Sequence, residues 1–298
     1  MIRNVGMMTR REFMIVPVGL SLMGCRGPKD ETPVVRFGMV TDLHYARIPD
    51  CPGDRYYAQG VEKLRQCVDV MNRRGVDFLV ELGDLKDQCE TKTETVSCLD
   101  EIEAEFRRFE GPRYHVLGNH DNDCLTKAEF LSHVSNHGQV AASGYYSFAV
   151  NGVTFVVLDA NFNAKMEDYS PGNWTWTDAN VPPCELDWLE RTLSAAPGRV
   201  IVFGHQRIDP AAEKRHRIRN AADVRNVLER SGRVAAVLTG HEHCGGHCVH
   251  HGIFYYTLRA LVKDSLPESN SFAEVTLYPS GRIIVTGYVK ATSAAGPR

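Results

Sequence analysis

The sequence Thr239-Gly240-His241-Glu242-His243 follows directly on an apolar run that extends from Val234 to Leu238. A short apolar run that ends at a glycine is typical of a buried strand in a parallel sheet. Ligands of such sheets bind just beyond the carboxyl ends of the strands. We therefore expect His241 and His243 to lie at a sheet edge where a ligand binds.

Four earlier fragments repeat this arrangement, in which polar donors follow a short apolar run. The runs span residues 34–40, 76–82, 114–117 and 200–203, and the fragments are Asp42-Leu43-His44, Gly83-Asp84-Leu85-Lys86-Asp87, Gly118-Asn119-His120-Asp121 and Gly204-His205. Because parallel strands end at one edge of a sheet, we expect all five fragments to meet there. Together they offer enough nitrogen and oxygen donors for two metal ions.

The composition is that of an ordinary globular protein. The chain has 298 residues, of which 43% are apolar and 24% charged, and a formal net charge of -3. This length allows one large α/β domain or two small ones. The balanced charge gives no indication of a nucleic-acid polymer as partner. We interpret residues 33–290 as a single domain and residues 291–298 as a tail.

The N-terminal segment has the features of an export signal. A twin arginine, Arg10-Arg11, precedes an apolar run over residues 14–24, which is too short to span a bilayer and fits the apolar region of a signal peptide. The run ends in Leu22-Met23-Gly24-Cys25, which resembles the lipobox of bacterial lipoproteins. We expect residues 1–25 to be a twin-arginine export signal, Cys25 to carry a lipid, and residues 26–32 to form a tether. The chain would then be periplasmic or on the cell surface, and membrane contact would occur only through this anchor.

The chain contains nine cysteines, and eight remain if Cys25 is lipidated. An even number in an oxidising compartment is compatible with disulfides. Short loops would close a Cys89–Cys98 pair and a Cys244–Cys248 pair. Free or buried thiols are the alternative, and the sequence does not decide between them.

The pattern of apolar residues predicts alternating strands and helices, with a change of pattern after residue 145. Helical spacing predicts helices over residues 60–74, 93–109, 127–136, 184–195 and 221–231. Asn151-Gly152 between two apolar runs predicts a hairpin, and residues 252–258, 271–277 and 282–289 have the pattern of antiparallel strands. Residues 161–182 form a long polar and aromatic loop, of a kind that is usually functional or disordered.

The motifs D-x-H, G-D-x-x-D, G-N-H-D, G-H and G-H-x-H, in this order, resemble those of the calcineurin-like metallophosphoesterases from residue 37 to residue 289. The resemblance implies an α/β fold of two mixed sheets flanked by helices, an αββα sandwich. It also implies a hydrolase of phosphoester or phosphoanhydride bonds that uses two metal ions and a metal-bridging hydroxide as nucleophile.

The resemblance also assigns roles to individual residues. Asp84 would bind both metals. The ligand set of one metal would be completed by Asp42, His44 and His243. The ligand set of the other would be completed by Asn119, His205 and His241. The imidazoles favour Mn, Fe or Zn over a site for Mg alone.

His120 matches the position that the family uses for a general acid, with Asp121 orienting it. The alternative role of His120 is a supporting hydrogen bond. Asp87 is expected only to brace its loop.

Three segments resemble the manganese-dependent ADP-ribose/CDP-alcohol diphosphatases. They are Arg55-Tyr56-Tyr57, residues 184–193 and residues 240–246. Those proteins tend to carry Gln where this chain has His44. The presence of His44 instead favours an assignment to the general phosphodiesterases or phosphomonoesterases. We expect Arg55 to bind a second phosphate and Tyr56, Tyr57, Trp174 or Trp176 to stack on a base. For Trp174 and Trp176, packing within a loop folded on itself is the alternative.

The sequence therefore predicts an enzyme acting on a small phosphorylated substrate, of the phosphodiesterase or pyrophosphatase type. Two alternatives remain, a phosphomonoesterase and a metal-holding surface lipoprotein that binds a phosphorylated ligand without turnover. His247, His250 and His251 make the region after His243 rich in histidine, and both a third metal site and plain solvated side chains fit that pattern.

Overall fold

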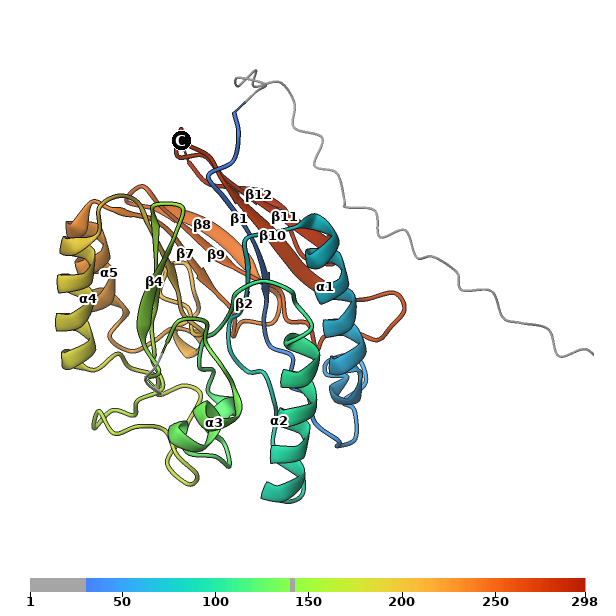
Figure 1. Ribbon diagram of the computed structural model, residues 1–298. Helices are drawn as coiled ribbons and strands as arrows, with labels where there is room; N and C mark the ends of the chain where they lie inside the picture. The colour runs from blue at the N-terminus through green and yellow to red at the C-terminus, as the bar shows by residue number, and fades with distance from the viewer. Residues whose placement is uncertain (1–30, 140–142, 298) are drawn as a thin grey trace, which may run out of the picture.

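The computed structural model describes residues 31–139 and 143–297, and it contains two six-stranded sheets that face each other (Figure 1). The first sheet has the strand order β12-β11-β10-β1-β2-β3, with bounds Ala294–Ala295, Ile283–Val289, Ser271–Leu277, Val35–Val40, Phe78–Glu81 and Arg113–His115. The second has the order β4-β5-β6-β7-β9-β8, with bounds Tyr146–Val150, Val153–Val157, Val200–Phe203, Val234–Thr239, Ile253–Thr257 and Gly246–His250.

Both sheets combine parallel and antiparallel strands. In the first, β1, β2 and β3 are parallel, and β10, β11 and β12 are added antiparallel. In the second, β5, β6, β7 and β9 are parallel, and β4 and β8 form antiparallel edges. The parallel strands at the centre of each sheet therefore end on the same side of the molecule, where the predicted donors follow them.

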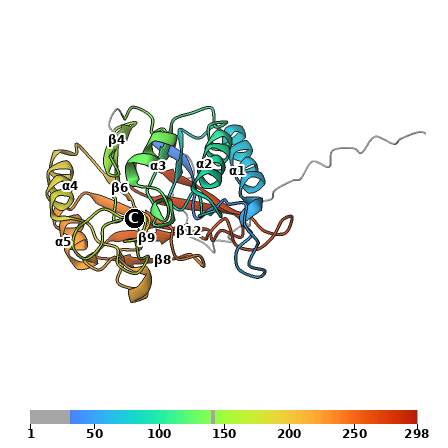
Figure 2. The same ribbon diagram turned by 90° about the horizontal axis from the view of Figure 1, so that it is seen from below.

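Helices cover the outer face of each sheet, as Figures 1 and 2 show. The first sheet is covered by α1 (Gly60–Arg74) and α2 (Lys92–Phe106), and the second by α4 (Pro183–Ala195) and α5 (Ala221–Ser231). A shorter helix, α3 (Lys127–His133), and three 3₁₀ turns, η1 (Tyr57–Gln59), η2 (His120–Asn122) and η3 (Lys214–His216), lie in the connections. The expected αββα sandwich is confirmed.

The helix α1 illustrates why these segments are helical. Its buried residues Leu64, Cys67, Val68 and Met71 recur at the spacing of one helix face. The helix ends at Gly75, whose φ of 60° is left-handed and whose N–H donates to the carbonyls of Met71 and Asn72. Glycine adopts this conformation without steric cost, which explains the sharp stop.

Aromatic side chains fill the layer between the two sheets. Phe37 of β1 stacks on Phe78 of β2 with ring centroids 4.7 Å apart, and it meets Phe155 and Phe203 of the second sheet edge-on at 5.6 Å. Large rings packed in this way contribute beyond the area they bury. The two sheets are thus joined by a packed aromatic core.

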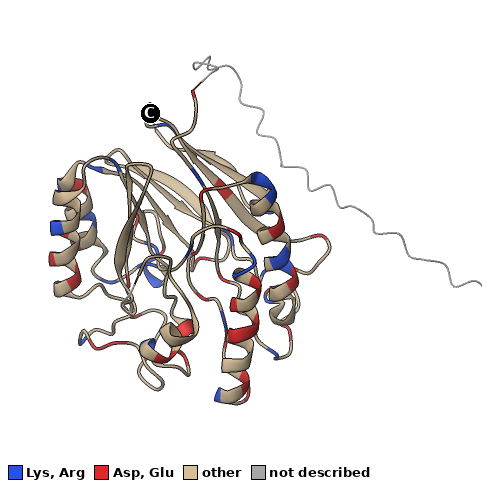
Figure 3. Ribbon diagram, viewed as in Figure 1, with Lys and Arg blue, Asp and Glu red and all other residues tan. Residues whose placement is uncertain are grey.

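Charged residues lie mainly on the outside of this sandwich. Figure 3 shows Lys, Arg, Asp and Glu of both signs on the four covering helices. Among the described residues, no helix is long and apolar enough to cross a membrane. Cys25 and the export signal lie outside the described residues.

Two segments differ from the prediction. Residues 246–250 were not predicted as a strand, yet they form β8, because an edge strand needs no apolar face. Residues 291–298 were expected to form a tail, but β12 pairs with β11 and Gly296 N donates to the carbonyl of Ile283 at 3.0 Å. Ala291 and Ala294 are buried there, so this segment closes the core instead of leaving it.

The cysteines that the structure describes are all free thiols. The sulfurs of the expected Cys89–Cys98 pair are buried and lie 3.5 Å apart.

Candidate metal centre

Loops from both sheets bring the predicted donors together at the carboxyl ends of the strands. Asp42 and His44 follow β1, Asp84 follows β2, and Asn119 follows β3. The second sheet contributes His205 after β6, and His241 and His243 after β7. The structure therefore collects all seven predicted ligands, four from one sheet and three from the other.

Asp42, His44 and His243 form the first group of donors. Their ligand atoms all lie within 4.8 Å of one another. His44 Nε2 is 3.1 Å from His243 Nε2, and His243 Nε2 is 3.5 Å from Asp42 Oδ1. The Asp42 carboxylate is held in place by the N–H of His241, which donates to Oδ2 at 2.9 Å.

Asp84, His205 and His241 form the second group, whose ligand atoms also lie within 4.8 Å of one another. His205 Nδ1 donates to the carbonyl of Leu82 at 2.8 Å, which leaves Nε2 as the nitrogen with the lone pair. That Nε2 lies 3.1 Å from Asp84 Oδ2. The backbone just after β2 thus fixes the tautomer that a metal ligand requires.

Asp84 lies between the two groups. Its Oδ2 atom is 3.1 Å from His205 Nε2 and 3.6 Å from His44 Nε2, so one carboxylate oxygen faces a donor of each group. Its other oxygen, Oδ1, accepts a hydrogen bond from the backbone N–H of His120 at 2.7 Å. This is the position that a carboxylate shared by two ions would need.

The donor atoms themselves indicate that metal ions fit here. Among the described residues, Asn119 Oδ1, His205 Nε2 and His241 Nε2 are buried side-chain atoms without a hydrogen-bond partner. Leaving a buried polar atom unpaired costs about 1–3 kcal/mol. Two divalent ions bound among these carboxylates and imidazoles would give all three atoms a partner. The mixture of nitrogen and oxygen donors suits Mn, Fe or Zn.

Close packing around these loops explains their glycines. A Cβ on Gly118 would lie 2.1 Å from the backbone nitrogen of Asp84, and one on Gly240 would lie 1.9 Å from Thr41 Oγ1. Any side chain there would displace a neighbouring ligand loop. The glycines of G-N-H-D and G-H-x-H are therefore steric requirements of the centre.

His120 begins the turn η2 beside the donors, and its imidazole is partly exposed. Its Nδ1 lies 3.2 Å from Asp87 Oδ1 and 3.6 Å from Asp123 Oδ2. Burial alone would lower the pKa of His120, but the charge of Asp84 and the carboxylates of Asp123 and Asp87 raise it to about 10. The carboxylates around the ring therefore favour its protonated form, which a general acid requires.

The two aspartates beside His120 have roles opposite to those expected. Asp121 was predicted to orient His120, but the turn η2 directs its carboxylate inward, where it accepts from the N–H groups of Asp84, Leu85 and Gly118 at 2.8–3.1 Å. Asp121 therefore braces the loops. Asp87 was expected only to brace its loop, yet its carboxylate lies 3.2 Å from both His120 Nδ1 and His44 Nδ1.

A cavity of about 620 Å³ opens above the donors. Its floor contains Asp84, Asn119, His120, His241 and His243. The remaining wall residues are Asp54, Arg55, Trp174, Trp176, Glu213, Arg215, His216, Glu242, Cys244 and Lys263. The size is within the ordinary range for small-molecule sites.

Of the five residues expected to contact substrate, Arg55, Trp174 and Trp176 line this cavity. Tyr57 is buried in the core beneath the first sheet's helices, because η1 turns its ring inward. The Tyr56 hydroxyl accepts from the N–H of Gly53 at 3.2 Å and supports the loop. The prediction of substrate contact for Tyr56 and Tyr57 is therefore wrong.

His216 belongs to none of the motifs, yet it is part of the cavity wall. Its ring lies 5.6 Å from that of Trp176 and 5.7 Å from that of His241. Arg215 and Lys263 were also missed. These residues lie in loops without a motif, so nothing local in the sequence indicated their position.

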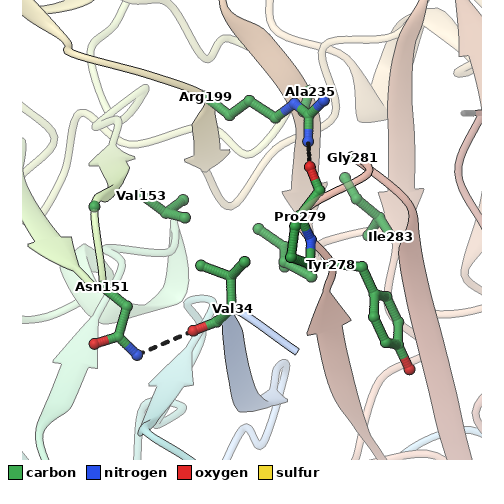
Figure 4. Close-up of a pocket in the computed structure, with 11 residues that line it drawn as sticks. Val34, Asn151, Val153, Arg199, Ala235, Tyr278, Pro279, Gly281 and Ile283 are labelled. Carbon is green, nitrogen blue, oxygen red and sulfur yellow. Dashed lines mark hydrogen bonds between the residues drawn. The ribbon is translucent and has the colours of Figure 1, made fainter. Parts of the chain in front are cut away.

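A second, smaller cavity of about 160 Å³ lies elsewhere, between residues near Val34 and Tyr278 (Figure 4). Arg199 closes it by donating to the carbonyls of Pro279 and Ser280, and Asn151 donates to the carbonyl of Val34. Its described lining contains none of the seven donors. We assign the chemistry to the larger cavity.

Comparison with known proteins agrees with this site. The family model described as calcineurin-like phosphoesterase matches residues 35–245. Relatives named manganese-dependent ADP-ribose/CDP-alcohol diphosphatase include one from Arabidopsis thaliana, 27% identical over 85% of this chain and 94% of its own length, and one from Danio rerio, 26% identical over 86% and 96%.

Solved structures share the fold. A dimetal phosphatase from Danio rerio superimposes with a TM-score of 0.78 at 24% identity and covers 89% of this chain and 99% of its own. A purple acid phosphatase from yellow lupin has a TM-score of 0.58 at 13% identity and covers 86% of this chain and 52% of its own.

The family match spans well over half of the 298 residues and includes every predicted ligand. The chain is a metal-dependent hydrolase of phosphoester or phosphoanhydride bonds with a dinuclear centre. It belongs to the calcineurin-like phosphoesterase family.

Proposed function

We propose that the substrate is a nucleoside diphosphate conjugate of the ADP-ribose or CDP-alcohol kind, and that the chain cleaves its diphosphate bond with Mn²⁺. The names of the relatives support this proposal. The observation that carries it is the composition of one cavity, which combines the donors on its floor with cationic and aromatic side chains on its walls.

The cationic side chains suit a second phosphate group. Arg55 and Lys263 both line the cavity. One guanidinium nitrogen of Arg55, Nη1, donates to Asp87 Oδ2 at 3.3 Å, and Nε lies 4.0 Å from Asp54 Oδ2, so among the described residues only Nη2 is left for a ligand. A diphosphate would extend from the metal donors toward this side, where charge-assisted hydrogen bonds hold it.

The aromatic side chains suit a nucleobase. The ring of Trp174 lies 5.1 Å from that of His120, and the ring of Trp176 lies 5.8 Å from that of His241. Trp176 is 37% exposed, a large apolar surface left open beside a polar site. Stacking of a base on such a ring contributes about 1–3 kcal/mol.

The metal ions and the side chains of the protein would have different roles in the mechanism. Two divalent ions in such a centre act as Lewis acids, which activate water and neutralise phosphate charge. Asp42, His44, Asp84, Asn119, His205, His241 and His243 would hold them. His120 would donate a proton to the leaving oxygen, and Asp87 would keep its ring in place through Nδ1.

A substrate panel tests this proposal. ADP-ribose, CDP-choline, bis-nitrophenyl phosphate, nitrophenyl phosphate and cyclic AMP would be assayed with Mn²⁺, Zn²⁺ and Mg²⁺. We expect the two conjugates with Mn²⁺ to give the highest kcat/KM. A clear preference for nitrophenyl phosphate would indicate a phosphomonoesterase, which is the alternative that the presence of His44 supports. Metal binding without turnover of any substrate would favour the ligand-binding alternative.

Tryptophan variants locate the base. Trp176→Ala should raise KM for ADP-ribose about 10-fold, the equivalent of ~1.4 kcal/mol of stacking. It should leave bis-nitrophenyl phosphate unaffected, because that substrate has no nucleobase. Trp188→Ala is the matched control, since this residue packs on Tyr145 away from the cavity.

We also propose that the chain is exported by the twin-arginine route and anchored through a lipid on Cys25. The sequence Leu22-Met23-Gly24-Cys25 supports it, ten residues before β1 begins at Val35. Mass spectrometry of the membrane fraction should find a chain that begins at a lipidated Cys25. A Cys25→Ala chain that fractionates with the membrane like wild type would contradict the anchor.

A further inference from the structure

A second cluster of metal-binding side chains lies where the helix α5 meets the turn between β8 and β9. Glu229 belongs to the last turn of α5, His250 is the last residue of β8, and His251 begins the loop between β8 and β9. We propose that these three residues form a surface site for a divalent transition-metal ion such as Zn²⁺, independent of the catalytic centre.

The geometry of the three side chains matches a metal site. One ligand atom of each residue lies within 4.8 Å of the others. Glu229 Oε2 is 2.7 Å from His251 Nδ1, and Glu229 Oε1 is 3.7 Å from His250 Nε2. Two ligands that are each about 2.0–2.2 Å from a tetrahedral ion lie roughly 3.4 Å apart, so small side-chain adjustments would seat the ion.

The backbone holds these side chains on rigid elements. His250 pairs with Ile253 across the β8–β9 hairpin, so the loop consists of His251 and Gly252 alone. Both have positive φ, 47° and 79°, as a type I′ turn requires. The two imidazoles consequently lie side by side, with ring centroids 4.0 Å apart, and both face the same carboxylate.

An unpaired atom points to a ligand at this place. Glu229 Oε1 is buried, and among the described residues it has no hydrogen-bond partner. A simple ion pair between Glu229 and His251 would leave this oxygen unsatisfied. His133 shows the contrast, because its Nδ1 meets Asp100 at 2.7 Å and no third metal-binding side chain joins that described pair.

The chemistry of the donors selects the ion. Two imidazoles and one carboxylate suit Zn²⁺, Ni²⁺ or Cu²⁺ and are poor ligands for Mg²⁺ or Ca²⁺. Three protein ligands leave a fourth position for water. The bound ion would join α5 to the edge of the second sheet.

This site is separate from the catalytic centre. Gly246 begins β8 three residues after His243, whereas His250 ends the strand, which places the turn roughly 13 Å further along at about 3.3 Å per residue. The inference therefore does not depend on the proposed substrate.

Counting ions tests the proposal. The chain would be saturated with Mn²⁺, titrated with Zn²⁺, and analysed by native mass spectrometry for total ions per chain. The total number of ions per chain does not change if Zn²⁺ replaces Mn²⁺ in the catalytic centre. We expect three ions in wild type and two in His250→Ala/His251→Ala, and we expect Zn²⁺ to raise the melting temperature of wild type more than that of the variant.

A matched variant controls for adventitious histidine binding. His247→Ala removes an exposed histidine of the same strand, for which the described residues offer no carboxylate within 4 Å. It should retain three ions. Wild type that binds only two ions, or a double variant that still binds three, would overturn the proposal. Because the first outcome is read on wild type, it does not depend on how the variant folds.

Discussion

Several proposed metal ligands have a backbone conformation that their residue types rarely adopt. Asp42, His44, Asp84 and His241 have φ values of 51°, 47°, 58° and 69°. A left-handed residue other than glycine costs about 1–3 kcal/mol and persists only where its surroundings enforce it. The loops therefore accept strain in order to aim side chains at one point, which is expected of a functional site.

Gly240 allows two of these loops to touch. A Cβ on Gly240 would lie 1.9 Å from Thr41 Oγ1 and 2.7 Å from Asp42 Oδ2, whereas no described atom lies within 4 Å of a Cβ on Gly204. Gly240→Ala should therefore displace Asp42 and weaken Mn²⁺ binding about 10–100-fold, as loss of a ligand's support typically does. Gly204→Ala is the matched control and should bind Mn²⁺ like wild type. Isothermal titration would measure both, and equal affinities in the two variants would contradict the packing argument.

His120 should influence the rate without holding the metals. If it protonates the leaving oxygen, His120→Ala should reduce kcat about 10²–10⁴-fold for cyclic AMP, whose alkoxide leaving group is a poor one. The loss should be much smaller for bis-nitrophenyl phosphate, whose leaving group needs no proton. Bound Mn²⁺ should stay at two ions per chain. An equal loss on both substrates would indicate a supporting hydrogen bond as its role.

At the scale of elements, the parts that were predictable are those set by local pattern. The bounds of α1, α5 and β10 follow from apolar spacing and are found as predicted. The strand β8 was missed because its residues alternate between half-buried and exposed and include two histidines and a glycine. An edge strand of this kind is stabilised by its neighbour β9, which the sequence of β8 does not reveal.

The same distinction explains the candidate site. The structure brings the seven predicted ligands and His120 together, and each of these residues could be predicted because it belongs to a motif at a strand end. The exchange of roles between Asp87 and Asp121 depends on how the turn η2 rotates its side chains. His216 reaches the cavity because its loop packs against Trp176. Both features are tertiary and carry no local signal.

A buried histidine links α2 to the first sheet and should make stability depend on pH. His115 on β3 lies 3.0 Å from Glu103 of α2 and 3.4 Å from Glu81 of β2. Burial lowers its pKa, but the carboxylates of Glu103 and Glu81 outweigh this and raise the value from 6.5 to about 9.

The direction of this dependence follows from the raised pKa. The stabilisation by His115 should be complete below pH 6.5 and lost as the pH rises through 9, with a magnitude of at most about 3 kcal/mol. Urea unfolding of wild type and His115→Gln across pH 6–10 measures it. We expect the difference in unfolding free energy between them to shrink with rising pH. A difference that is constant would show that His115 does not titrate in this range.

At the scale of the molecule, the centre lies where the two sheets meet. Four ligands come from the first sheet and three from the second. Bound ions would therefore tie the two halves of the sandwich together at the end opposite to the β10–β11 turn, to which Arg199 donates hydrogen bonds. Ligand binding to the folded state stabilises it by mass action.

Metal removal should therefore loosen the whole sandwich. At 100 times its dissociation constant, Mn²⁺ should add about 2.7 kcal/mol, which corresponds to roughly 5–10 °C in melting temperature. Chelation with EDTA should reverse this gain. Asp84→Ala should show little response to either treatment, and a full Mn²⁺ response in that variant would place the stabilising ion elsewhere.

The position of the metal ions tests the central claim most directly. Anomalous diffraction from crystals of the chain grown with Mn²⁺ would locate each ion without reference to activity. We predict two peaks about 3.5–4 Å apart, with Asp84 between them and His205 and His243 on opposite sides. A single peak, or two peaks that do not share Asp84, would contradict the dinuclear centre.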